Sequence, residues 1–206
     1  ALVADDTSGL QIIDFSNPSA PVLRGTYDTP GNANRVTTSG TLALVADEVS
    51  GLQIIDFSNP AAPVLRGTYD TPGTALDVAI SGTLALVADD FAGLQIIDFT
   101  NPAAPVLRGT YNTPGNARGV AIAGTLALVA DETSGLYIVD FSNPTAPVLR
   151  GTYRTLASAA RVTISGNLAL VADYGSGLQI IDLTSGFLQF SLPPLSLRGQ
   201  RYTIAV

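Results

Sequence analysis

A pentapeptide that recurs at a constant interval constrains this chain more than any other feature. Ala-Leu-Val-Ala-Asp begins at residues 1, 43, 85, 127 and 169, so each unit is 42 residues long. Residues 1–31 and 43–73 are identical at 28 of 31 positions. Such a period is typical of a supersecondary unit stacked on copies of itself, because one unit cannot bury its apolar surface alone. The unbroken repeat therefore predicts a single domain over residues 1–206.

Each unit has the pattern of four β-strands and leaves no room for a helix. In the second copy, the runs 35–39, 41–47, 51–57 and 63–69 are separated by turns rich in Gly, Asn and Pro. The first two runs are apolar or small at nearly every position, as expected for strands that are covered on both faces. The fourth carries a recurring Arg beside Pro and Gly, which suits an outer edge strand. The sequence predicts an all-β fold, a five-bladed β-propeller of four-stranded antiparallel blades with the first strand innermost.

The length of the chain indicates how the ring closes. Five complete units would need four more residues than the 206 present, and the missing four correspond to the turn 39–42. The chain therefore begins with a second strand and ends with a first strand, 203–206, which aligns with 77–80. We predict that this last strand joins the N-terminal strands, because a closed ring removes two free edges. The predicted blades are 35–70, 77–112, 119–154, 161–195, and a composite of 203–206 with 1–28.

Composition excludes several classes of function. The chain has no Cys and no His, which excludes disulfides, thiolate metal sites and the usual acid–base and nucleophile pairs. A net charge of −7 disfavours nucleic acid as a partner, and no apolar run approaches the ~20 residues of a membrane span. We expect a monomer without cofactor or metal. An acidic, cysteine-free repeat domain fits an extracellular or cell-surface location, as a mature product or an excised domain.

The repeat also resembles a known family. The motif Leu136-Tyr-Ile-Val-Asp140 appears elsewhere in the chain as Leu-Gln-Ile-Ile-Asp, between Ser-Asn-Pro-x-x-Pro and Gly-x-Tyr-x-Thr-Pro-Gly segments. This pattern, over residues 1–186, resembles the LVIVD repeat of bacterial and archaeal surface proteins. Strand order and closure are similar to those of WD-repeat propellers, although the Trp-Asp signature is absent. The resemblance implies a propeller, often attached to larger extracellular proteins, with no established catalytic residues. Segment 187–202 departs from the pattern and lacks the Arg and Tyr of the fourth strand.

Two aspartate series are the same in all five copies. One series, 14, 56, 98, 140 and 182, ends the third strand, and in four copies a Ser/Thr-Asn-Pro turn follows. The other series, 5, 47, 89, 131 and 173, ends the second strand. We expect both to accept hydrogen bonds from local backbone amides. Differences between copies gather in the turn between the second and third strands and in the connection between blades. In a propeller both regions lie on one rim, which we interpret as a binding surface.

The variable positions include charged and aromatic side chains. Near the mouth of the predicted channel, Arg35, Arg118 and Arg161 face a single Asp77, and this local positive charge suits a carboxylate or another small anion. The aromatic residues are suited to stacking on sugar rings or packing on a protein partner. The alternatives are neutral drift in solvent loops and simple pairing of Asp77 with one of the arginines. The candidate ligand-binding residues are Asn34, Arg35, Leu76, Asp77, Phe91, Arg118, Arg161, Tyr174 and Tyr202.

These observations favour a non-enzymatic binding or interaction module within a larger extracellular protein. Its ligand would be a protein, a carbohydrate or a small anion. The alternative is a structural, recently amplified or engineered scaffold without a ligand. A glycan-processing enzyme is less favoured, because glycosidases need two opposed carboxylates and Asp77 is the one carboxylate at a mouth position. Replacing Arg35 and Arg161 together with alanine is expected to change stability little, as at surface positions.

Overall fold

The computed structural model describes residues 1–184, which form five antiparallel β-sheets and, within this range, no helix. The three central sheets have four strands each, hydrogen-bonded in chain order. Their strands are β4 (Arg35–Ser39), β5 (Leu42–Ala46), β6 (Leu52–Asp56) and β7 (Val64–Tyr69); β8 (Asp77–Ser81), β9 (Leu84–Ala88), β10 (Leu94–Asp98) and β11 (Val106–Tyr111); and β12 (Gly119–Ala123), β13 (Leu126–Ala130), β14 (Leu136–Asp140) and β15 (Val148–Tyr153). These sheets confirm the strands predicted for blades 35–70, 77–112 and 119–154.

The first and the fifth sheets each have three strands in the described part of the chain. The predicted fourth strand of blade 161–195 and the closing strand 203–206 both lie outside the described residues. The fifth sheet begins earlier than predicted, because Ser158 pairs with Tyr174 and extends both strands of that hairpin. The strands are β1 (Leu2–Ala4), β2 (Leu10–Asp14) and β3 (Val22–Tyr27) in the first sheet, and β16 (Ser158–Ser165), β17 (Leu168–Tyr174) and β18 (Gly177–Asp182) in the fifth.

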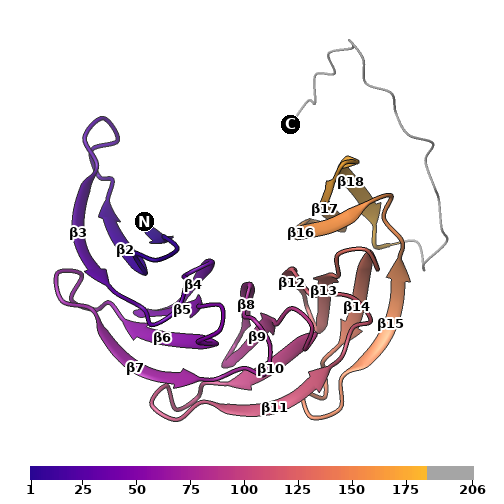
Figure 1. Ribbon diagram of the computed structural model, residues 1–206, viewed down its shortest axis with the longest axis horizontal. Helices are drawn as coiled ribbons and strands as arrows, with labels where there is room; N and C mark the ends of the chain where they lie inside the picture. Colours follow the sequence, from indigo (N-terminus) through magenta and orange to yellow (C-terminus); the bar gives the residue numbers. More distant parts are fainter. Residues whose placement is uncertain (185–206) are drawn as a thin grey trace.

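The five sheets follow one another around an arc (Figure 1). The first strands β4, β8, β12 and β16 lie on its inner side, and β3, β7, β11 and β15 lie on its outer side. Neighbouring sheets contact each other through the inner strands, β1 with β4, β4 with β8, β8 with β12 and β12 with β16. The predicted order, with the first strand innermost, is therefore confirmed. Within residues 1–184 no strand pairing joins the fifth sheet to the first.

Within residues 1–184 the core consists of four apolar clusters, one between each consecutive pair of sheets. Between the second and third sheets, Leu52 and Ile54 pack against Val78 and Val87. Every residue of β6 is buried, and its aliphatic side chains serve both neighbouring seams, Leu52 and Ile54 on one face and Ile55 on the other. Each such aliphatic side chain contributes roughly 1.5–3 kcal/mol on burial. The sheets are held side by side mainly by this inter-sheet packing.

The outer strands are protected by an ion pair and a bulge. In β7, Arg66 is the extra residue at the register shift opposite Ile54 and Ile55. Its Nη2 lies 2.6 Å from Oδ2 of Asp56, whose other oxygen accepts the Ser58 N–H at 2.8 Å. The Ser58 N–H and then the Arg66 guanidinium lower the pKa of Asp56 to about 2. A bulged, charged edge resists pairing with another chain, and the predicted local amide bonds of this aspartate series are confirmed. The same ion pair joins Arg24 to Asp14, Arg108 to Asp98 and Arg150 to Asp140.

The second aspartate series does not bind local amides as predicted; at Asp89, for example, it holds the connection between sheets. Asp89 at the end of β9 is completely buried. Its Oδ1 accepts the Thr71 hydroxyl at 2.6 Å and its Oδ2 accepts the Gly73 N–H at 2.9 Å. Both donors lie in the connection from β7 to β8, 18 and 16 residues earlier in the chain. We call this arrangement the connector latch. It also joins Thr29 and Gly31 to Asp47, and Thr113 and Gly115 to Asp131.

The connector latch explains why Gly73 is a glycine, and the latch differs in the fourth copy, where Ala157 replaces this glycine. A Cβ added at Gly73 would lie 2.1 Å from the carbonyl oxygen of Asp89. The fourth copy has Ala157 at the equivalent position, and there Asp173 accepts the Ala157 N–H at 3.0 Å. The Thr155 hydroxyl, however, is 3.4 Å from the Ala157 carbonyl oxygen, and Oδ1 of Asp173 is buried without a partner among the described residues. This copy of the latch has lost one of its two hydrogen bonds.

Candidate functional site

The two variable regions lie at the same end of the sheets, as predicted. Glu48, in the turn between β5 and β6, forms a backbone bridge with Ala75 in the connection that leads to β8. The equivalent bridges are Asp6 with Ala33, Asp90 with Ala117 and Glu132 with Ala159. Each of these four acidic residues has a positive φ, between 43° and 48°, which is uncommon outside glycine. The bridges and the connector latch hold each connection rigidly against the sheets on both sides of it.

The strongest candidate site is a cluster of three charged residues on the inner strands, Arg35, Asp77 and Arg161, which we call the Asp77 cluster. Asp77 is the first residue of β8, and its side chain is only 5 % exposed. Nε of Arg35 lies 3.3 Å from Oδ1 of Asp77, and Nη1 of Arg161 lies 3.5 Å from Oδ2. The two arginine side chains are 57 % and 40 % exposed. Two half-exposed cations therefore share one buried anion.

Backbone amides complete the surroundings of the Asp77 carboxylate. The Val78 N–H donates to Oδ1 at 2.9 Å, and the Val120 N–H, from the neighbouring strand β12, donates to Oδ2 at 3.2 Å. Burial raises the pKa of Asp77, and the charges of Arg161 and Arg35 and the two amides oppose that rise. Each carboxylate oxygen thus faces one guanidinium and one amide donor. Removing both arginines would leave a buried carboxylate without a counter-ion, so the expectation that their replacement leaves stability unchanged is revised.

Gly119 provides the room that Arg161 uses to reach Asp77. It is the first residue of β12, between the strands that carry the two charged side chains. A Cβ at this position would lie 3.0 Å from Cα of Arg161 and 3.4 Å from Oδ2 of Asp77. Nη1 of Arg161 also donates to the carbonyl oxygens of Arg118, at 2.6 Å, and of Leu76, at 3.2 Å. The Arg161 guanidinium is therefore fixed by groups from two other sheets.

The side chains of Arg118 and Asn34 do not join the Asp77 cluster, contrary to the prediction that Arg118 faces Asp77. Nη2 of Arg118 lies 2.6 Å from Oε1 of Glu132, in the turn after β13. Asn34 donates in the same way to Oε1 of Glu48 at 3.0 Å. Both pairs link the start of an inner strand to the acidic residue of the adjacent turn. The sequence did not indicate these pairs, because their members lie 14 residues apart.

The predicted aromatic residues are not gathered at the cluster either. Phe91 and Tyr174 are exposed in the turns after β9 and β17. No hydrogen bond or ion pair that the structure places links them to Asp77. Tyr202 lies outside the described residues. Of the nine candidates, the structure brings together the side chains of Arg35, Asp77 and Arg161 and the carbonyl groups of Leu76 and Arg118.

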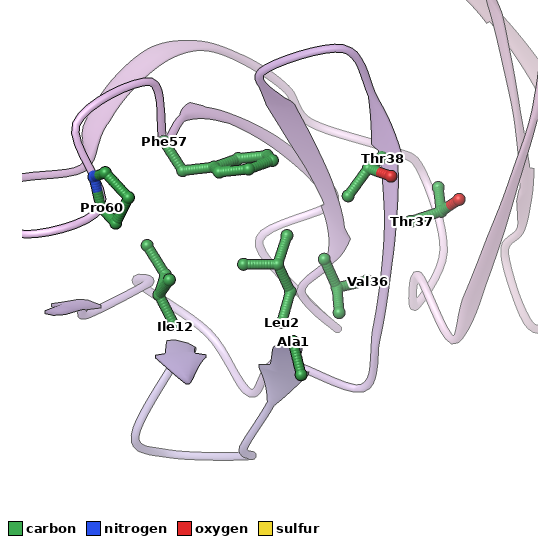
Figure 2. Close-up of a pocket in the computed structure, with 8 residues that line it drawn as sticks. All are labelled: Ala1, Leu2, Ile12, Val36, Thr37, Thr38, Phe57 and Pro60. Carbon is green, nitrogen blue, oxygen red and sulfur yellow. The ribbon is translucent and has the colours of Figure 1, made fainter. Parts of the chain in front are cut away.

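A separate apolar groove of about 540 Å³ lies between the first and second sheets (Figure 2). Leu2 and Ile12 point into it from the first sheet, and the Phe57 ring and Val36 face them from the second. Thr38 lines the same groove. The third, fourth and fifth sheets have an isoleucine at this position, and it packs against the inter-sheet core in each case: Ile80, Ile122 and Ile164. The smaller, polar Thr38 supplies less apolar volume to the first of these seams.

The described residues contain no group of three or more His, Cys, Asp or Glu side chains placed to hold a metal ion. Within residues 1–184 there is also no helix of the length and apolar character needed to cross a membrane.

The fold and the inner-strand site define an all-β repeat protein in which five similar antiparallel sheets present a charged cluster at one end. Comparison with known families assigns it further. The LVIVD repeat matches residues 1–29, 30–71, 72–113, 114–155 and 157–186. The chain belongs to the LVIVD repeat family, as its motif indicated. No curated protein matched the chain.

Solved structures show a similar fold at low sequence identity. One is the crystal structure of a functionally unknown protein from Desulfotomaculum acetoxidans DSM 771, with a TM-score of 0.75 and 17 % identity. The match covers 92 % of this chain and 64 % of that protein, so the chain spans less than two thirds of its length. Another is the crystal structure of the computationally designed Ika4 protein, with a TM-score of 0.59, 7 % identity, and coverage of 75 % of this chain and 93 % of the designed one. At these identities the similarity concerns the fold alone.

Proposed function

We propose that the chain forms a closed five-bladed propeller and serves as a non-enzymatic binding module, within a larger extracellular or cell-surface protein. The Asp77 cluster is its ligand site, at the mouth of the central channel, and a small anion is its ligand. The observation that carries this proposal is the charge of the cluster. Two half-exposed arginines share one buried carboxylate, which among residues 1–184 leaves one positive charge without a counter-ion, in a chain of net charge −7.

Two apolar sheet faces that have no partner within the described part of the chain support closure of the ring. On the fifth sheet Leu178 and Ile180 are 59 % and 57 % exposed, whereas the equivalent side chains of the other four sheets are buried in inter-sheet cores. On the first sheet Phe15 is 59 % exposed, while its equivalent Phe99 is 4 % exposed. These faces correspond to the two sides of the seam that the chain forms four times between its other sheets. Pairing of 203–206 with β1 would bring them together and bury both.

The site supports binding more than catalysis. Asp77 is the one carboxylate of the cluster, and it is buried and held by two arginines and two amides. A glycosidase needs a second carboxylate across the scissile bond, one acting as acid and the other as base or nucleophile. The outward N–H groups of the two guanidiniums are instead suited to a planar or multiply charged anion, because they are fixed donors with full charge.

A structural scaffold without a ligand is the second candidate. The observation that favours it is the internal pairing at this end of the molecule, where Glu132 neutralises Arg118 and Glu48 accepts from Asn34. The candidates differ in what an added anion does. A scaffold without a ligand site should bind a carboxylate no more tightly than it binds chloride.

The deciding experiment is a titration with citrate followed by NMR of the arginine side chains, at constant ionic strength set with sodium chloride. We expect saturable shifts of Arg35 and Arg161 in the wild-type protein. Arg35→Ala should weaken citrate binding by about 10-fold or more, since a hydrogen bond to a charged group contributes roughly 1.5–3 kcal/mol. Arg66→Ala is the matched control, because Arg66 is equally exposed and also pairs with an aspartate, but on the outer strand β7. Equal losses in both variants, or no saturation in the wild type, would establish the scaffold instead.

A further inference from the structure

The protein already holds one carboxylate in the cluster, and the way it is held defines the chemistry of the site. Each oxygen of Asp77 has two positive or N–H partners, Arg35 and Val78 at Oδ1, and Arg161 and Val120 at Oδ2. These four groups come from four different strands, β4, β8, β12 and β16, and together they already accommodate a carboxylate, a planar anion with two oxygens. We infer that the Asp77 cluster is a carboxylate-binding cradle, which its own Asp77 occupies and from which that side chain restricts an external carboxylate.

The repeat shows that the position of Asp77 tolerates very different side chains. The same position, counted along the 42-residue unit, is Arg35 in the second copy, Gly119 in the fourth and Arg161 in the fifth. The backbone there accepts a side chain of any size, from glycine to arginine, at the start of an inner strand. The donors do not come from Asp77's own strand alone. Arg35 is on β4, the Val120 N–H on β12 and Arg161 on β16.

Two of the four donors, Arg161 and the Val120 amide, are held in place by contacts other than Asp77. Arg161 remains bonded to the carbonyl groups of Leu76 and Arg118, and its neighbour Gly119 keeps the space beside it open. The Val120 amide belongs to the sheet formed by β12 and β13, and its position does not depend on Asp77. A glycine at position 77 would therefore leave a space the size of one acetate group beside Arg161 and the Val120 amide, with Arg35 at its exposed side. Formate is small enough to enter it.

This inference deepens the proposed function and rests on it for the site. It adds that the ligand is a carboxylate and that the Asp77 side chain competes with it for the site. In the wild type, an external carboxylate reaches only the exposed side of Arg35 and Arg161, because the Asp77 carboxylate lies against their other side. Without that side chain, a carboxylate reaches all four donors. The affinity for a small carboxylate should therefore rise when Asp77 is removed, although a charged residue of the site is lost.

The test is rescue of Asp77→Gly by formate, measured as the thermal unfolding midpoint against sodium chloride at equal concentration. We expect the variant to be destabilised, and formate to raise its midpoint by several degrees more than chloride does, while the wild type shifts by less than about one degree. A tenfold tighter formate affinity in the variant than in the wild type is the corresponding result by NMR titration. Sulfate stabilises folded proteins in general, so it should raise the midpoints of the variant and the wild type by the same amount.

Controls separate this inference from general anion effects. Asp77→Asn removes the charge but fills the space with an amide, so formate should not rescue it. Asp56→Gly removes an outer-rim aspartate that also pairs with an arginine, and it should respond to formate as to chloride. If Asp77→Gly does not fold, Asp77→Ala leaves a smaller space for the same titration. Equal responses to formate and chloride in the folded variant would overturn the inference.

The outcomes also distinguish the inference from the proposed function. Citrate binding by the wild type without formate rescue of the variant would leave the binding module standing and overturn the cradle. Rescue of the variant without any citrate binding by the wild type would support the cradle. That result would also show that Asp77 always fills the cradle in the wild type, which agrees with a structural scaffold that binds no ligand.

Discussion

The hydrogen bond from Thr71 to Asp89 in the connector latch should stabilise the protein, and the fourth copy, which lacks the equivalent bond, provides the control. Replacing Thr71 with valine keeps the shape of the side chain and removes the hydroxyl that donates to Oδ1 of Asp89 at 2.6 Å. Thr155→Val makes the same change in the fourth copy, where the hydroxyl does not bond to Asp173. Both threonines are buried, 5 % and 6 % exposed, so the change in apolar burial is nearly equal.

The magnitude follows from what each replacement leaves behind. Asp89 is completely buried, and Thr71 is the described partner of its Oδ1, so the variant leaves a buried carboxylate oxygen without a donor. An orphaned buried polar group costs about 1–3 kcal/mol. Thr155→Val orphans nothing new, because Oδ1 of Asp173 already lacks a partner in the described residues. Its effect should remain within about 0.5 kcal/mol.

The assay is urea unfolding at neutral pH, followed by far-ultraviolet circular dichroism because the chain contains no Trp. We expect Thr71→Val to lower the free energy of unfolding by about 1–3 kcal/mol, which for a chain of this size is a fall of roughly 2–10 °C in the melting midpoint. Thr155→Val should superimpose on the wild type. Equal losses in the two variants would refute the reasoning, since the hydrogen bond would then not distinguish them.

Three further predictions concern closure, pH and packing. Deletion of 203–206 should open the ring and lower the melting midpoint, because Ile204 and Val206 each lose roughly 1.5–3 kcal/mol of burial; a melt within a degree of the full chain would contradict closure. Burial raises the pKa of Asp89 to about 6 from an ordinary value of 3.8. Between about pH 4 and 6 the folded protein therefore binds more protons than the unfolded protein, and the free energy of unfolding should fall as the pH rises through that window. Unfolding titrations should show a weaker fall in Asp89→Asn, and an unchanged slope would mean that this carboxyl does not titrate there. Thr38→Ile should raise the free energy of unfolding by about 0.5–2 kcal/mol by filling the groove between the first and second sheets. Thr163→Ile is the control, because Thr163 is also exposed on an inner strand but does not line the groove, and a gain as large there would show that the groove is not the cause.

The sequence determined the elements of this protein and their order. The 42-residue period, the β-branched runs and the Gly, Asn and Pro turns predicted four strands in a unit, and the Arg in the last strand marked the outer edge. These features are local, since strand propensity, turn chemistry and edge protection are all properties of short segments. They predicted the strands of the three complete sheets, together with the local hydrogen bonds of Asp14, Asp56, Asp98, Asp140 and Asp182.

Only the tertiary structure decided the partners of the charged residues. Asp47 and Asp56 both end a strand and look alike in the sequence, yet the first holds a connection from 16 to 18 residues away and the second binds the next turn. Asp77 meets Arg161 because Gly119, in the intervening sheet, leaves room for the contact, and Arg118 is drawn instead to Glu132. A periodic sequence specifies each unit by its own residues. The contacts between units depend on distances of a few ångströms between neighbouring sheets. The curvature of the whole arc sets these distances, so the sequence of one unit does not determine them.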